Sequence, residues 1–158
     1  MQITKTQIFD CISLPQDKEL FMDVLEKNKQ IVKRFNKEVI QNCNEVSFKE
    51  LMHVNFVNRS APENANDSNA MWNTFSSVLK PAFPDLTVEI FDQVAEGDNV
   101  TTRKAITGTH LGVLMGIAPT QKKIRIDVID IVRLQDGKYI EHWGLNTLPT
   151  VLAELRSA

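Results

Sequence analysis

Residues 123–145 read KIRIDVIDIVRLQDGKYIEHWGL, two apolar runs around a short polar turn. Apolar side chains recur in steps of two through both runs, which is the period of a β-strand. The tripeptide Gln135-Asp136-Gly137 between them is a strong hairpin signal, because glycine readily adopts the left-handed backbone conformation. The stretch therefore predicts two antiparallel strands, about 123–134 and 138–145.

Upstream of this hairpin, the apolar period changes from two to between three and four. Steps of two predict further strands at 86–91 and 99–110 and a brief extended piece near 54–57. Steps of three and four predict helices at 17–40, at 67–79 and at 148–155. Ser47 and Glu50 have capping-box spacing and predict a short helix that starts at Ser47.

Helices followed by strands, with hairpin-length links among the last strands, indicate an α+β domain. We expect an antiparallel sheet covered on one face by the N-terminal helices. No internal repeat or linker divides the chain, so a single domain over 1–158 is predicted, with 1–16 as a loosely ordered extension.

Composition excludes several classes of function. Lys plus Arg number 18 against 20 Asp plus Glu, so the net charge of −2 favours neither nucleic acid nor a membrane surface. The sequence contains no nucleotide-binding glycine motif, and its three His lack metal-ligand spacing, so we expect no metal site. Cys11 and Cys43 form no CxxC motif, and without a signal peptide the expected compartment is the cytoplasm.

Six short motifs occur in an order and spacing that resemble a known family. They are PAFPD at 81–85, EGD at 96–98, GTH at 108–110, GIAPT at 116–120, IDIVR at 129–133 and DGKYIEHW at 136–143. Across about 28–155 the chain resembles the SnoaL-like polyketide cyclases, or ester cyclases, of the nuclear-transport-factor-2-like superfamily.

The resemblance implies a cone-shaped fold around a deep pocket for a small organic molecule, usually in a homodimer joined through the outer sheet surface. It also implies a cofactor-independent, intramolecular aldol ring closure, in which a carboxylate removes a proton next to a carbonyl. The family's Asp base follows Glu-His-Trp directly, and here that position is Gly144. The family's usual His is here Arg59, and the further acidic position is Asn146 or Thr147.

An alternative base can be sought in the predicted hairpin. With a three-residue loop, Asp130 lies opposite His142, and with a two-residue loop it lies opposite Trp143; we favour the first register. A carboxylate beside an imidazole raises the His pKa and can orient the ring as a base. The pair can equally be a structural hydrogen bond in a half-buried sheet.

The remaining candidate residues surround the expected pocket. His110, at a strand end, either donates to a ligand carbonyl or caps the turn, so the catalytic candidates are His142, Asp130 and His110. Arg103 is expected to pair with an acid such as Glu89 or, less simply, with a ligand carboxylate. The predicted substrate-binding side chains, of which the aromatic ones could instead belong to the core, are Phe56, Asn58, Trp72, Met115, Trp143 and Asn146.

Three functions are compatible with these residues. The first is a cofactor-independent cyclase or isomerase that abstracts a proton next to the carbonyl of a small, mostly apolar molecule. The second is a non-catalytic binding protein that has lost the Asp base at the position of Gly144. The third is an accessory domain whose pocket is filled by its own side chains.

Overall fold

The computed structural model describes residues 16–157, with side chains from residue 22 onward. The predicted N-terminal extension, apart from Gln16, and Cys11 lie outside the described residues. The long predicted helix is confirmed as α1 (Gln16–Arg34), which continues in a π-helical segment, η1 (Phe35–Gln41). Its apolar face contributes Val32, Phe35 and Val39 to the core.

The short helix α2 (Glu45–Leu51) begins earlier than predicted. Asn44, and not Ser47, is the N-cap residue, and its side chain accepts a hydrogen bond from the Ser47 backbone N–H at 3.1 Å. Glu50 does not form a capping box, because its carboxylate accepts hydrogen bonds from Arg34, the last residue of α1. The predicted start at Ser47 is therefore wrong by two residues.

The helix predicted at 67–79 is confirmed and extends slightly further. It consists of α3 (Ser68–Asn73), a second π-helical segment η3 (Thr74–Leu79) and α4 (Lys80–Ala82). Pro81 lies in the first turn of α4, where the missing N–H of a proline is tolerated. A 3₁₀ turn, η2 (Glu63–Ala65), lies in the predicted polar loop, and α5 (Leu148–Arg156) ends the described chain.

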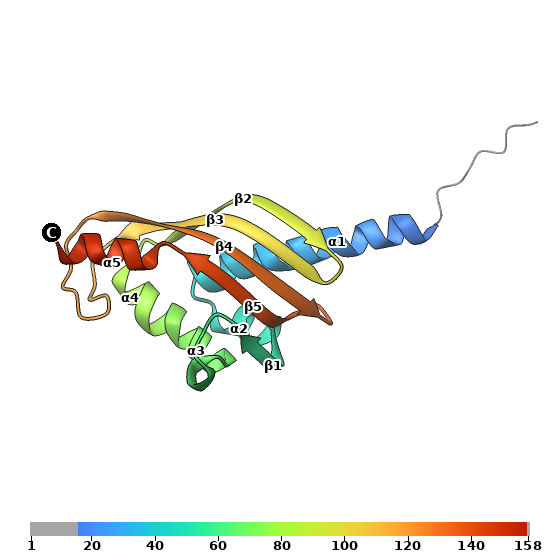
Figure 1. Cartoon of the computed structure of the whole chain (residues 1–158), viewed down its shortest axis with the longest axis horizontal. Helices are drawn as coiled ribbons and strands as arrows, with labels where there is room; N and C mark the ends of the chain where they lie inside the picture. Colours follow the sequence, from blue (N-terminus) through green and yellow to red (C-terminus); the bar gives the residue numbers. More distant parts are fainter. Residues whose placement is uncertain (1–15, 158) are drawn as a thin grey trace, which may run out of the picture.

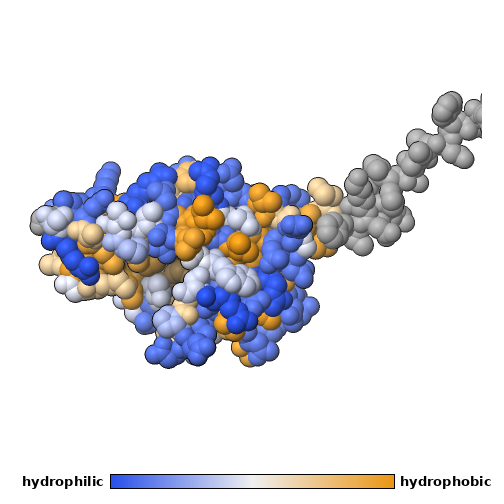
Figure 2. Space-filling view, in the orientation of Figure 1, coloured by the Kyte–Doolittle hydropathy of each residue, from blue (hydrophilic) through white to orange (hydrophobic). Residues whose placement is uncertain are grey.

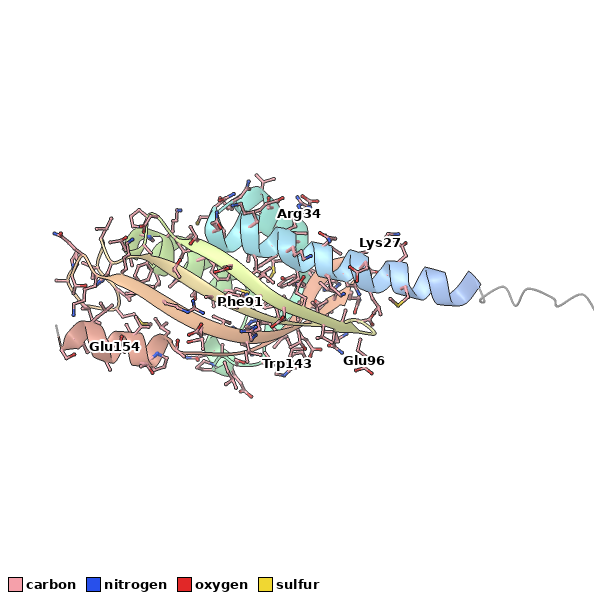
Figure 3. The ribbon with its side chains drawn as sticks, turned by 90° about the horizontal axis from the view of Figure 1, so that it is seen from above. Lys27, Arg34, Phe91, Glu96, Trp143 and Glu154 are labelled. Atoms are coloured by element: carbon pink, nitrogen blue, oxygen red, sulfur yellow. The ribbon has the colours of Figure 1, made fainter. Side chains whose placement is uncertain are left out.

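The five predicted extended segments form one mixed sheet in the order β1-β5-β4-β3-β2. Only β1 runs parallel to its neighbour β5, and the other pairs are antiparallel. The strands are β1 (Met52–Asn58), β2 (Thr87–Glu96), β3 (Asn99–Thr109), β4 (Lys123–Gln135) and β5 (Lys138–Asn146). Figure 1 shows the long curved strands β2 to β5, and Figure 3 shows α1 on one side of the sheet and α5 on the other.

The register of the β4–β5 hairpin corrects the prediction. Asp136 and Gly137 both have positive φ, 51° and 73°, and form a two-residue turn closed by Gln135 and Lys138. The register then shifts: Leu134 pairs with Tyr139 but Arg133 pairs with Glu141, so Ile140 is an extra residue, a β-bulge.

Because of this bulge, Asp130 lies opposite Gly144, and His142 lies opposite Val132. Both predicted registers, Asp130 opposite His142 or opposite Trp143, are therefore wrong. The two side chains nevertheless occupy diagonal positions on the same face of the sheet, within reach of each other.

That face, which we call the inner face, points toward η1 and η3. On β3 the alternating residues Val100, Thr102, Lys104 and Ile106 are all buried there. On β4 the buried alternation runs from Ile124 to Leu134 and includes Asp130. The inner face thus carries two charged side chains, Lys104 and Asp130, among apolar ones.

Candidate functional site

A cavity of about 200 Å³ lies between the inner face, the two π-helical segments and the start of α5. Its apolar lining comes from Ile40, Met71, Phe75, Leu79, Ile106, Ile126, Val128 and Leu148. Its polar lining comes from Asn58, Thr74, Lys104, Asp130, His142 and Asn146. Figure 2 shows the surface hollowed between the α5 end of the molecule and the helices below the sheet.

A larger hollow of about 380 Å³ lies between α1 and β2. Its charged lining comes from Lys29 and Lys33 of α1, Lys37 of η1 and Asp92 of β2, which are exposed or partly exposed. We place the candidate site in the smaller cavity because it brings buried ionisable side chains together against an apolar wall, which is the usual character of a ligand site.

Lys104 and Asp130 form a buried ion pair at the wall of this cavity. Lys104 Nζ lies 2.7 Å from Asp130 Oδ2, and the two side chains are only 3% and 6% exposed. The same ammonium donates to Asn36 Oδ1 at 2.7 Å, and Asn36 in turn donates to the Val32 carbonyl at 2.8 Å. Asn36 belongs to the π-helical segment η1, and such segments are frequent at functional sites.

The charge state of Asp130 follows from this pairing. Burial penalises the carboxylate and would raise its pKa, but the charge of Lys104, the hydrogen bond from Lys104 and the neighbouring His142 outweigh that penalty. The pKa of Asp130 is therefore below its ordinary value, and the group is ionised at neutral pH. Burial, with the charge of Asp130 adding to it, raises the pKa of Tyr139 well above its ordinary value.

His142 is held between two partners. Its Nε2 lies 3.7 Å from Asp130 Oδ2, and its Nδ1 lies 3.0 Å from Asn58 Oδ1. When Nδ1 carries the proton and donates to Asn58, Nε2 has a lone pair that faces the cavity wall beside the carboxylate. An imidazolium formed at Nε2 would be stabilised by Asp130.

Gly144 leaves space for the ring of His142. A Cβ added there would lie 2.9 Å from His142 Cε1 and 3.2 Å from Nε2, too close for the ring as it stands. The imidazole therefore occupies the space that a side chain at residue 144 would need. In this chain the ionisable group at that place is His142.

The structure brings together four of the predicted site residues. Asp130, His142, Asn58 and Asn146 all line the cavity. The structure places the other predicted residues outside it. Phe56 is buried in the core, Trp72 packs on Phe48 beside a different surface groove, and Met115 is exposed in the loop after β3.

Trp143 lies on the outer face of the sheet, opposite Ile131, and Figure 3 shows it on the side away from α1. His110 is fully buried, and its Nδ1 lies 3.1 Å from Thr120 Oγ1 and accepts from the Thr120 N–H at 3.3 Å. This geometry is that of the turn-capping alternative for His110. Arg103 pairs with Asp92, not with Glu89, and also lies over the Phe91 ring.

Sequence reasoning missed Lys104 and Asn36. Each is a polar residue inside an apolar pattern: Lys104 alternates with Val100, Thr102 and Ile106, and Asn36 lies next to Phe35 on the buried side of a helix. Long charged side chains are almost never fully buried unless they are paired. A lysine in phase with buried strand positions was therefore a usable signal for a partner on a neighbouring strand.

Within residues 16–157, no group of three or more His, Cys, Asp or Glu side chains is arranged to hold a metal ion. Among the helices described, none is long and apolar enough to cross a membrane.

Comparison with known proteins identifies the scaffold. The model of the SnoaL-like polyketide cyclase family matches residues 30–155. A search of curated proteins found no match. Among solved structures, AclR of Streptomyces galilaeus, a candidate hydroxylase, is similar with a TM-score of 0.74 at 25% identity, over 85% of this chain and 83% of that one.

Two further structures extend the likeness. IdmH of Streptomyces antibioticus, a candidate polyketide cyclase, has a TM-score of 0.69 at 25% identity, covering 82% of this chain and 98% of that one. An NTF2-like protein of Mesorhizobium loti has a TM-score of 0.55 at 20% identity, covering 78% and 93%. The chain therefore belongs to the SnoaL-like polyketide cyclase family and has the NTF2-like α+β fold.

Proposed function

We propose that this protein binds a small, largely apolar carbonyl compound in the cavity and removes a proton next to the carbonyl, with His142 as the base. The observation that carries the proposal is the position of His142 Nε2, at an apolar cavity and 3.7 Å from the ionised Asp130. The family's habit of cofactor-independent enolate chemistry supports it.

The proposed step moves one proton. The C–H bond next to the carbonyl breaks, the proton goes to His142 Nε2, and the electron pair becomes an enolate. Asn58 holds the other ring nitrogen, and Asp130 stabilises the imidazolium that forms. Attack of the enolate carbon on a second carbonyl closes the ring, and the alkoxide that forms takes the proton back from His142. Return of the proton to another carbon of the enolate gives isomerisation instead.

A second candidate function is ligand binding without catalysis. It is favoured by Gly144, which supplies no carboxylate where the family's cyclases have their base. The cavity is open and not filled by the chain's own side chains, which favours either of these functions over an accessory domain with a vestigial pocket.

An experiment on the exchange of α-protons for deuterium distinguishes the two functions. Small cyclic ketones are incubated with the protein in D₂O, and loss of the α-proton signal is followed by NMR. We expect exchange above the buffer rate, and a fall of about 10²–10⁴-fold in the His142→Asn variant, the range for one acid–base group.

The matched control is His53→Asn, the same substitution at a histidine that does not line the cavity, which should leave the rate unchanged. Equal rates for wild type and His142→Asn would refute His142 as the base. Binding of the ketones with no exchange at all would select the non-catalytic function.

We also propose a homodimer joined through the outer face of the sheet. Exposed apolar side chains gather there, namely Val94, Ile129, Ile131, Trp143 and Leu145. Contiguous exposed apolar surface of this kind often marks a protein interface. Light scattering should give twice the chain mass, and Ile131→Lys should give a monomer, whereas Val54→Lys on the exposed side of the edge strand β1 should not.

The proposed compartment remains the cytoplasm. Cys43 carries a free thiol among the described residues, and burial raises its pKa, so little of it is the reactive thiolate. A thiol of this kind is compatible with a reducing compartment.

A further inference from the structure

We infer that Ser60 is a positioning residue for His142 and holds its ring in the tautomer that carries the proton on Nδ1. Ser60 acts through Asn58, the residue that contacts the ring. This role rests on the proposed function only in that His142 is the base, and it decides which of the two ring nitrogens is basic.

The first step is the identity of the Asn58 atom that faces the ring. The side chain of an asparagine ends in an oxygen and an NH₂ group of similar shape, and its hydrogen-bond partners show which is which. The backbone N–H of Ser60 lies 3.1 Å from Oδ1 of Asn58, as in an Asx turn. A backbone N–H can only donate, so the atom that it faces is the oxygen. The same oxygen lies 3.0 Å from Nδ1 of His142.

The second step is the tautomer of His142. The Asn58 oxygen can only accept, so a contact of 3.0 Å requires a proton on Nδ1. The other nitrogen has no comparable bond, because 3.7 Å between Nε2 and Asp130 Oδ2 is too long for a hydrogen bond. In the neutral ring the single proton is therefore on Nδ1, and Nε2 keeps the lone pair.

Ser60 itself is held against the strand that carries His142. Its Oγ accepts a hydrogen bond from the backbone N–H of Gly144 at 2.7 Å. The preceding residue, Arg59, donates its backbone N–H to the carbonyl oxygen of His142 at 2.8 Å. Strand β1 ends at Asn58, beside His142 of β5, and these two bonds continue the contact with β5 beyond that end. The Ser60 N–H is thus fixed relative to the ring.

The side chain of Arg59 adds a second attachment to β5. Its guanidinium donates to Glu141 Oε1 from Nε at 2.9 Å and from Nη2 at 2.6 Å. Arg133 donates to the other oxygen of the same carboxylate. Arg59 occupies the position of the family's usual His, and in this chain it holds the segment that carries Ser60 on the strand of His142.

Ser60 lies outside the cavity, which separates its role from ligand binding. Asn58 and His142 line the cavity, whereas Ser60 is exposed and is not part of the lining. Loss of the Ser60 hydroxyl should therefore change the state of the ring and the rate of proton abstraction, and it should leave the affinity for a ketone unchanged.

The test reads the tautomer from the ¹⁵N–¹H NMR correlations of the imidazole rings. Protein labelled with ¹⁵N-histidine is measured at about pH 9, well above the ordinary imidazole pKa of about 6.5, where the two neutral tautomers can be distinguished. The signals of His142 are identified by their loss in His142→Asn. We expect the Nδ1–H pattern in the wild type.

The decisive variant is Ser60→Ala, which removes the hydrogen bond from Gly144 and so loosens the turn that holds Asn58. A measurable share of the His142 rings should then show the Nε2–H pattern. The rate of α-proton exchange should fall about 2–10-fold, the factor for one neutral hydrogen bond, and the Kd of the ketones measured by calorimetry should not change.

Two further variants control this result. Ser60→Thr keeps the hydroxyl and should behave as the wild type in tautomer and rate. Ser77→Ala is the same substitution at an exposed serine that does not line the cavity, and it should change neither.

An Nε2–H pattern in the wild type would overturn the inference, as would an unchanged Nδ1–H pattern in folded Ser60→Ala. If Ser60→Ala does not fold, Ser60→Gly, which also lacks the hydroxyl, is judged by the same criterion. Exchange by a wild type with an Nε2–H ring refutes the role of Ser60 and leaves the proposed function. An Nδ1–H ring that depends on Ser60, in a protein without exchange, refutes the base role of His142 and leaves Ser60 as the residue that sets its tautomer.

Discussion

Strand β3 carries two neighbouring ion pairs on opposite faces. Lys104 pairs with Asp130 across the inner face, and Arg103 pairs with Asp92 across the outer face, both through N–O contacts of 2.7 Å or less. The inner side chains are 3% and 6% exposed, and the outer ones 56% and 61%. Opposite charges attract each other in both pairs, but only the inner pair is buried away from water.

This difference decides what each pair can do. An exposed pair is screened by water and salt and adds little stability. A buried pair is held by the cost of separating its charges, and it brings a strong local field to the cavity. The inner pair can therefore position a ligand or a base, whereas the outer pair lies on the surface that we propose for a dimer.

The largest effect is expected from Lys104→Met. Removing one partner leaves Asp130 as an unpaired buried charge, so the free energy of unfolding should fall by about 3–5 kcal/mol. Urea denaturation measures the change. The contrast between the two pairs is refuted if Lys104→Met lowers the free energy of unfolding no more than Arg103→Gln does in the outer pair.

A smaller effect is expected from acid, because a protonated Asp130 is neutral but remains beside Lys104. The folded pKa of Asp130 lies below the unfolded value of roughly 3.9, so its stabilisation is complete above that value and is lost as pH falls through the folded pKa. The difference in unfolding free energy between wild type and Asp130→Asn should therefore shrink below about pH 4. A constant difference from pH 7 to pH 2 would show that Asp130 is not stabilised as an anion.

Gly144→Ala tests the packing of the inner face. The added methyl meets the His142 ring, and overpacking of this kind typically costs about 1–3 kcal/mol. The ring should also move, which NMR signals of the His142 imidazole would report. Val54→Ala, on the exposed side of the edge strand β1 and 90% exposed, should change stability by less than about 0.5 kcal/mol.

The smallest effect is expected from Arg103→Gln. Loss of the exposed pair with Asp92 should cost less than about 1 kcal/mol, and high salt should reduce the difference further. Unfolding curves at low and high ionic strength check this. A salt-independent loss of several kcal/mol would remove the contrast between the two faces.

Much of the fold could be predicted from the sequence because local pattern determines it. The alternation in 86–91, 99–110 and 123–145 and the helical period of 17–40 each correspond to an element of the structure. The boundary at Ser47 was missed because Asn44, three residues earlier, is the better-placed cap. Local signals thus located elements well and their ends less well.

The candidate site was harder to predict because it depends on how strands pair. Asp130 and His142 were recognised, but the bulge at Ile140 changed their register, and a bulge leaves no clear mark in a single sequence. Trp72 and Trp143 were expected near the cavity for their chemistry, whereas the structure places one beside Phe48 and the other on the outer face. Lys104 was overlooked because its partners are 26 and 68 residues away in the chain.

The bulge at Ile140 also affects how the length of this hairpin could vary. Tyr139 and Ile140 are consecutive and both buried, and beyond them the residues again alternate between inner and outer positions. Deleting Ile140 would keep the cross-strand pairs Leu134–Tyr139 and Arg133–Glu141. His142 would then still lie opposite Val132 on the inner face of the sheet. Deleting Glu141 instead would bring Ile140 opposite Arg133 and would also keep His142 opposite Val132, but it would remove the ion pair between Arg133 and Glu141. Ile140 is therefore the position in this half of β5 where the chain can be shortened by one residue without changing its two faces or losing that ion pair.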